Sequence, residues 1–187
     1  MTFFEFVLII TSVIYALCMA PLLSGFVRIL QFDGEVKHFL PQAFLSLHLF
    51  VIVVVVWWTM WWFRDVSWYF ATYFYIVTEP VVMFLACSLI FPNKLDGDSV
   101  DLESHYYKIR VPLLISILVS ALLVFSDGIV LGVEAPWLTR RYAQLVYVVL
   151  LIWALIDKRR SAQYACALGL FVILFSLIAL WFWVPAN

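Results

Sequence analysis

The sequence predicts an all-α integral membrane protein, built as a compact bundle of six transmembrane helices with no soluble domain. Hydrophobic residues make up 66% of its 187 residues, charged residues make up 12%, and the mean hydropathy is +1.07. The charged residues gather in five short segments, which divide the chain into six apolar stretches. A chain of this composition consists largely of bilayer-spanning segments. We therefore expect a multi-pass protein of a bacterial inner membrane.

Each apolar stretch is interpreted as one helix, because about 20 apolar residues cross the hydrocarbon core of a bilayer. The first stretch has no basic n-region or cleavage pattern, so we expect it to be a membrane span and not a removable signal peptide. The fifth stretch has only fifteen uncharged residues, which leaves a full crossing and a re-entrant segment both open. The expected spans, forming one transmembrane domain over 1–187, are 3–30, 39–63, 68–91, 111–133, 142–156 and 162–184.

Lysine and arginine are distributed unevenly over the turns between these spans. Eight of the eleven lie in the first, third and fifth turns, whereas only Arg64, Arg140 and Arg141 lie in the second and fourth. Because basic residues concentrate in cytoplasmic loops, this predicts that both termini lie on the non-cytoplasmic side. Eight of the nine tryptophans fall at that same face, where indole rings are expected at the membrane interface.

Glu79 and Pro80 lie side by side near the middle of the third expected span. A carboxylate at this depth costs several kcal/mol unless it is protonated or paired, so it indicates a functional site. Pro80 has no N–H group for the carbonyl of Ile76, which leaves a free acceptor beside the acid. The pair therefore predicts a polar site inside the membrane, where a water molecule or a cation could bind.

Asp127 and His48 are two further ionisable residues that lie well inside the expected spans, away from the terminal turns. Asp127 lies near the outer end of the fourth span, where Arg140 and Arg141 could form ion pairs with it. His48 lies toward the cytoplasmic end of the second span, where it could bond to another helix or transfer protons. Ordered by depth, Asp127, Glu79 and His48 resemble the staggered residues of a proton pathway. Separate structural roles for the three residues remain the alternative.

Tryptophans form two adjacent pairs, one helical turn apart, near the outer end of the second span. They either enlarge the interfacial aromatic belt or form a flat platform for a lipid, a quinone-like ring, a pigment or a partner helix. The residues of this aromatic platform are Trp57, Trp58, Trp61 and Trp62.

Small residues at four-residue spacing predict helix packing faces, because helices in lipid associate where their backbones approach closely. One such ridge lies on the first span, at Ala16 and Ala20. Whether these ridges pack within one chain or between copies stays open. The ridge on the fourth span ends in a G-x-x-x-G motif and comprises Ser116, Ser120, Gly128 and Gly132.

Motifs for catalysis are absent from the sequence. We find no G-x-S-x-G, Walker, Rossmann or H-E-x-x-H pattern, so we predict neither catalytic residues nor an enzyme. His38 and His105 fall in loops, away from His48, which argues against a haem or metal site. We predict no cofactor, although contact with a lipid, a quinone or a pigment is possible. The expected partners are membrane lipids and either further copies of the chain or a larger membrane complex, with no nucleic acid.

These observations favour a small transporter or channel that conducts protons or cations through the mid-membrane carboxylate. In this hypothesis Glu79 is the central site, Pro80 opens the backbone, Asp127 lies at the entrance and His48 near the exit. The alternative is a noncatalytic structural or assembly subunit of a larger membrane complex, which presents its tryptophan face to partners.

Overall fold

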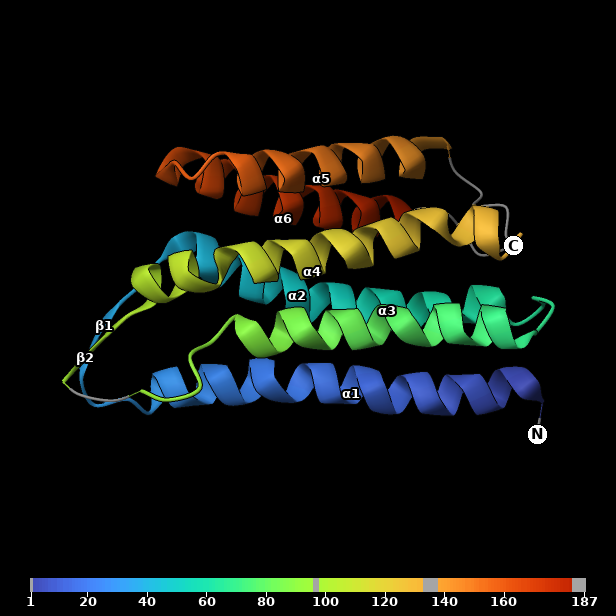
Figure 1. Cartoon of the computed structure of the whole chain (residues 1–187), viewed down its shortest axis with the longest axis horizontal. Coiled ribbons are helices and arrows are strands. Elements are labelled where there is room, and N and C mark those ends of the chain that lie inside the picture. The colour runs from blue at the N-terminus through green and yellow to red at the C-terminus, as the bar shows by residue number, and fades with distance from the viewer. Residues whose placement is uncertain (1, 96–97, 133–137, 183–187) are drawn as a thin grey trace.

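The computed structural model describes residues 2–95, 98–132 and 138–182, and it shows an all-α bundle of six helices (Figure 1). Five of the helices are long and apolar enough to cross a membrane. The predicted fold class is therefore confirmed. The elements of the described chain are α1 (Phe3–Leu30), β1 (Glu35–Lys37), α2 (Leu40–Thr59), the 3₁₀ helix η1 (Met60–Phe63), α3 (Phe70–Leu89), β2 (Ser99–Asp101), α4 (Leu102–Val130), α5 (Leu138–Ile156) and α6 (Arg160–Phe182).

The largest difference from the expected spans lies at the start of α4, which begins at Leu102 and not near residue 111. Asp101 caps the helix, since its carboxylate accepts a hydrogen bond from the backbone N–H of Ser104 over 2.9 Å. Pro112 lies inside α4 without ending it. The first turns of α4 thus bring polar residues into the bundle, among them Arg110, which is 3% exposed.

The fifth expected span corresponds to α5, a continuous helix of 19 residues. At 1.5 Å per residue it is roughly 28 Å long, close to the thickness of a bilayer core. It lies beside α4 and α6 over most of the bundle length (Figure 1). The length and direction of α5 fit a crossing, but α5 is not among the five helices that are long and apolar enough to span a membrane, so the re-entrant alternative stays open. Residues 183 and 184, the expected end of the sixth span, lie outside the described residues.

The six helices pack in the ring order α1, α3, α4, α5, α6, α2, and α2 closes the ring against α1. Helix α2 also contacts α3 and α4, which places it against the centre of the bundle. Fully buried leucines such as Leu22, Leu49 and Leu113 fill the core between these helices. Because the helices alternate in direction, α1 begins and α6 ends at the same end of the bundle (Figure 1).

Two short strands, which the sequence analysis did not predict, join loops at the other end of the bundle. They pair in parallel, with Glu35 opposite Ser99 and Lys37 opposite Asp101. We call this end of the molecule, with β1 and β2, the strand end, and we call the end with η1 (Met60–Phe63) the tryptophan end (Figure 1).

Candidate functional site

Glu79 on α3 lies against α1 and α4. It is 7% exposed, and each carboxylate oxygen accepts one hydrogen bond. Tyr15 Oη donates to Oε2 over 2.5 Å, and Ser120 Oγ donates to Oε1 over 2.7 Å. Hydroxyl donors from two neighbouring helices thus satisfy the buried acid. Tyr15 was not among the predicted site residues, although it is the only tyrosine of the first expected span.

Pro80 is buried inside α3, and the helix continues through it to Leu89. The Cys18 thiol of α1 donates to the Pro80 carbonyl oxygen over 3.3 Å and to the Ile14 carbonyl oxygen over 3.2 Å. Pro80 therefore lies at the contact between α1 and α3. Its role in binding a water molecule or a cation stays a prediction.

Asp127 on α4 is partly buried and lies within reach of α3. Tyr75 Oη donates to Asp127 Oδ1 over 3.1 Å, lies 2.8 Å from Ser126 Oγ and also donates to the Leu123 carbonyl oxygen. Tyr75 precedes Glu79 by four residues, so both face α4 from the same side of α3. The interface of α3 and α4 therefore carries polar contacts at two successive turns.

The ion pairs of Asp127 with Arg140 and Arg141 stay a prediction. Arg141 is exposed at the start of α5. The side chain of Arg140 lies outside the described residues, so its pairing with Asp127 stays a prediction.

His48 on α2 is fully buried, and its Nε2 lies 2.7 Å from Tyr147 Oη on α5. Its Nδ1 has no hydrogen-bond partner among the described residues. Tyr147 was not among the predicted site residues, because the order of the helices in the bundle decides which side chain meets His48. In the described part of the chain, no group of three or more His, Cys, Asp or Glu residues could bind a metal ion.

A cavity of about 370 Å³ lies between α2, α4, α5 and α6, and Met83 of α3 reaches its wall. Most of its lining is aliphatic. Four side chains bring hydroxyl or amide groups to it, namely Thr59, Ser120, Gln144 and Tyr147. The same Ser120 that bonds to Glu79 and the same Tyr147 that bonds to His48 therefore line one cavity.

The structure thus connects two of the three predicted pathway residues through this cavity. Glu79 and His48 each lie one hydroxyl group away from it. Asp127 bonds to Tyr75 at a separate position on α4 and is not among the residues that line the cavity. The described hydrogen bonds do not join the three residues into one continuous chain.

A second buried polar cluster, missed by the sequence analysis, lies toward the strand end. Arg110 Nη1 donates to the carbonyl oxygens of Ala154 and Leu155 in the last turn of α5. Gln163 Nε2 donates to the Ala154 carbonyl over 2.9 Å, and Tyr106 Oη donates to Gln163 Oε1 over 2.7 Å. These donors satisfy carbonyls that the end of a helix leaves without partners. The expected spans leave Arg110 in the loop before residue 111, and nothing in the sequence indicates that its side chain is buried.

The tryptophans of the aromatic platform lie at the end of α2 and in η1. Trp57 and Trp58 are 41% and 69% exposed, and Trp61 and Trp62 are 61% and 44% exposed. The indole N–H of Trp57 donates to Ser12 Oγ over 2.9 Å. Their exposure suits an interfacial belt, and a role as a platform stays a prediction.

The two small-residue ridges lie in different surroundings, and whether they pack between copies of the chain stays a prediction. Ser116 and Ser120 are buried, Gly128 is partly exposed, and Ala16 and Ala20 face outward. Among the described residues, Gly132 makes no close helix contact: α4 ends at Val130, Gly132 has a φ of 65°, and a Cβ atom added to it would meet no described atom within 4 Å. A glycine with positive φ commonly ends a helix, so the G-x-x-x-G motif does not form a continuous helical ridge.

No protein-family model, no curated protein and no solved structure matches the chain. Its function is therefore argued from the chemistry of the site.

Proposed function

We propose that this membrane protein is a small proton-coupled transporter, with Glu79 as its central proton-binding group and the cavity as its substrate site. One observation carries the proposal: two buried ionisable side chains, Glu79 and His48, each hydrogen-bond to a hydroxyl that lines the same cavity. Ionisable residues inside a membrane often mark the pathway of a proton, an ion or a substrate.

The hydroxyl of Ser120 supports coupling between the acid and the cavity, because a hydroxyl can both donate and accept a hydrogen bond. The Ser120 hydroxyl donates to the carboxylate form of Glu79. When Glu79 is protonated it can donate in turn, and the Ser120 proton is then free to turn toward an occupant of the cavity. A change in protonation would thereby change the hydrogen bonds that the cavity wall offers.

The lining of the cavity favours a carrier over an open pore. Aliphatic side chains dominate it, and Glu79 itself is enclosed by hydroxyl donors from α1 and α4. Protons would therefore move when a substrate or water enters. Pro80 supports such a change of state, since a proline removes one backbone hydrogen bond and eases bending of α3 there. Asp127 lies toward the tryptophan end and would take part at the entrance.

A flux assay in proteoliposomes tests the proposal. The purified protein is reconstituted in a total bacterial lipid extract with a pH-sensitive dye inside, and a potassium diffusion potential drives protons inward. We expect the wild-type protein to acidify the lumen and Glu79→Gln to fall to the rate of protein-free vesicles. Flux that is unchanged in Glu79→Gln would refute the proposal.

Two further variants sharpen this assay. Asp65→Asn removes a carboxylate from an exposed loop, where the Asp65 side chain is 86% exposed, and we expect it to keep wild-type flux. Ser120→Ala keeps Glu79 but removes the hydroxyl between it and the cavity, so we expect lower flux from a folded protein. Equal losses in Asp65→Asn and Glu79→Gln would point to a general charge effect.

A role as a subunit of a larger membrane complex is the second candidate. It is favoured by the outward position of Ala16 and Ala20 on α1, since small residues allow a partner helix to approach closely. Purification in a gentle detergent would then recover a stoichiometric partner. Ala20→Leu should release that partner, and isolation of the chain by itself would count against this candidate.

A further inference from the structure

We infer that the cavity binds an uncharged single-chain amphiphile, whose polar head faces the tryptophan end and whose chain reaches the middle of the bundle. The inference deepens the proposed function, on which it rests for its site, by naming the class of substrate.

The absence of charge in the cavity lining excludes a charged ligand. Among the described residues that line it there is no Asp, Glu, Lys or Arg. A phosphate, a carboxylate or an ammonium group would lose its hydration there without gaining a counter-ion, which costs far more than burial of a neutral polar group. The occupant is therefore neutral.

The volume and the walls of the cavity suit one apolar chain. About 370 Å³ lies near the lower limit of typical small-molecule pockets, roughly 300–1,000 Å³. Branched aliphatic side chains of α2 and α6, such as Ile52, Val56, Leu174 and Leu177, form much of the wall. A chain of methylene groups fills such a space with favourable transfer from water, whereas a two-chain phospholipid carries a charged head that the lining cannot pair.

The polar side chains of the cavity set the direction of the ligand. Thr59 ends α2 and Gln144 lies near the start of α5, so both belong to the tryptophan end. The hydroxyls of Thr59, Ser120 and Tyr147 already bond to protein groups. The Gln144 amide has no hydrogen bond to any described residue, and it offers one acceptor and two donors to a neutral hydroxyl or carbonyl head.

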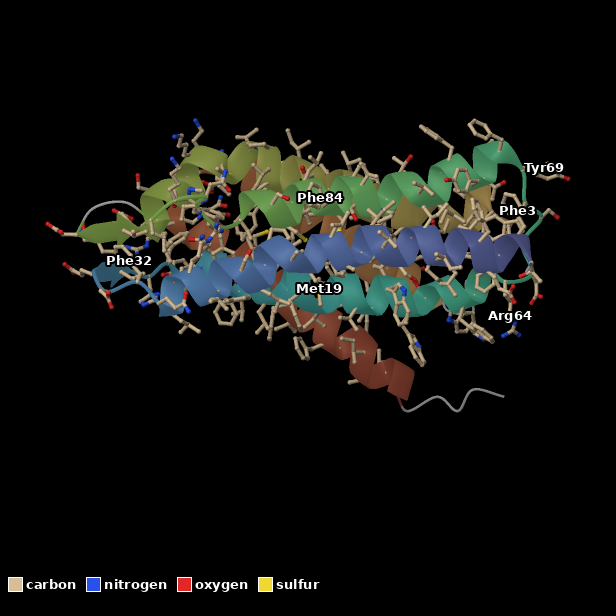
Figure 2. All side chains as sticks on the ribbon, turned by 90° about the horizontal axis from the view of Figure 1, so that it is seen from below. Phe3, Met19, Phe32, Arg64, Tyr69 and Phe84 are labelled. Atoms are coloured by element: carbon tan, nitrogen blue, oxygen red, sulfur yellow. The ribbon has the colours of Figure 1, made fainter. Side chains whose placement is uncertain are left out.

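Helix α6 provides the route of entry from the bilayer. Its C-terminal part diverges from the other helices (Figure 2), and Leu180, which lines the cavity there, is 57% exposed. Leu177 and Ile173, about one and two turns earlier, are partly exposed as well. The cavity is thus open to the lipid side, and an amphiphile with its head at the interface can enter sideways without leaving the membrane.

Photolabelling with matched probes tests the inference on the purified full-length protein in lipid nanodiscs. The probes are hexadecanol and palmitic acid, each carrying a diazirine in the middle of the chain, at a pH where the acid is ionised. We expect saturable labelling of α2 and α6 peptides by the alcohol, competed by unlabelled hexadecanol. For Gln144→Leu, the loss of one hydrogen bond should weaken binding of the alcohol about fivefold. Equal labelling by both probes would overturn the inference.

Variants that fill the cavity complete the test. Ala121→Phe and, as a second choice, Leu177→Trp add volume to residues that line the cavity, and they should abolish saturable labelling. Val172→Phe, on the exposed side of α6, should not change it. Labelling that persists in both folded cavity variants would overturn the inference. Labelling needs no proton gradient, so the two proposals can fail separately. A protein that is labelled but shows no proton flux would refute the transporter and support the amphiphile site. A protein that shows flux but does not bind the alcohol would refute the amphiphile site and support the transporter.

Discussion

Glu79 is accommodated inside the bundle because hydroxyl groups replace the water that a carboxyl group would otherwise bind. Tyr15 and Ser120 come from different helices, and each satisfies one oxygen. A buried acceptor that loses its donor costs free energy even when the remaining packing is unchanged. The stability of the bundle therefore depends on contacts between helices that the sequence does not disclose.

Tyr15→Phe removes one donor to Glu79 and leaves the ring in place. We expect a loss of about 1 kcal/mol in the free energy of unfolding, since hydrogen bonds between helices in membranes are of this size. The measurement is the unfolding midpoint in mixed micelles titrated with SDS. Tyr69→Phe, at a side chain that is 70% exposed, is the matched control and should unfold as the wild type does. Equal midpoints for both variants would contradict a supporting role for Tyr15.

Arg110 is a buried cation whose partners are backbone carbonyls of α5. Arg110→Met keeps most of the side-chain volume but removes the donors and the charge at the end of that helix. We expect it to lower the free energy of unfolding by about 2 kcal/mol, because hydrogen bonds from charged groups are stronger than neutral ones. The same SDS titration measures the loss. Arg159→Met removes the same charge from an exposed residue and should have little effect on the free energy of unfolding. A comparable loss of stability in Arg159→Met would mean that both effects come from the change in net charge.

At the scale of the helices, two glycines show how the same residue serves different purposes. Gly25 allows α1 to approach Phe91, since a Cβ atom there would lie 2.3 Å from Phe91 Cδ2 and 2.8 Å from Phe91 Cβ. Gly132 lies in open space and supplies the positive φ that follows the end of α4. The four-residue spacing predicted that Gly132 is a packing residue and gave no such prediction for Gly25. Spacing alone does not distinguish a glycine at a helix contact from one at a helix end.

Gly25→Ala should destabilise the contact between α1 and Phe91. The added methyl group forces Phe91 to move, and overpacking of this kind costs about 1–3 kcal/mol, more than the roughly 1 kcal/mol that alanine contributes to a helix. SDS unfolding measures the change. In a Phe91→Ala background the penalty should disappear, because the obstructing ring is gone. Ala16→Leu, which enlarges an outward-facing residue of the same helix, should be nearly neutral. A penalty that persists without the ring would contradict this explanation.

At the scale of the whole molecule, the ring of helices encloses the cavity and gives the bundle two different ends. Helices α4, α5 and α6 enclose the cavity against α2, so no single helix contains it. The two ends of the bundle also differ, with paired strands at one and tryptophans at the other. The excess of lysine and arginine in the turns at the strand end predicts that this end faces the cytoplasm.

Labelling of one introduced cysteine at a time, in intact cells, tests that orientation. Ser67 and Ser99 are both exposed, Ser67 in the loop after η1 and Ser99 in β2, and serine is close to cysteine in size. We expect a membrane-impermeant maleimide to label Ser67→Cys in intact cells and Ser99→Cys only after permeabilisation. The native Cys18, Cys87 and Cys166 are buried, so the wild-type protein gives the background. The opposite pattern would invert the orientation and place both termini in the cytoplasm.

The buried ionisable residues of the candidate site were predictable from the sequence, but the side chains that contact them were not. Glu79 and His48 stand out in the sequence because charged or polar groups are costly in lipid. Their partners Tyr15 and Tyr147 do not stand out, and Ser120 stands out only as part of a ridge of small residues, which gives no sign of its bond to Glu79. Arg110 was missed for a related reason: α4 begins at Leu102, earlier than the apolar stretch, so a residue counted as loop is buried. Gln163 lies at the start of the sixth expected span, and nothing in the sequence indicates its contacts with Tyr106 and Ala154.

The number of helices, their order along the chain and the apolar class of the protein were determined by the sequence, because these properties add up residue by residue along each segment. The rotation of each helix and its neighbours were decided only by the tertiary structure. A helix that is apolar on every side gives no periodic signal for its inward face, so the sequence does not disclose which side chains meet. The hydroxyl contacts of Glu79 and His48, the cavity between them and the close approach at Gly25 all depend on that choice of neighbours, which packing between distant segments makes.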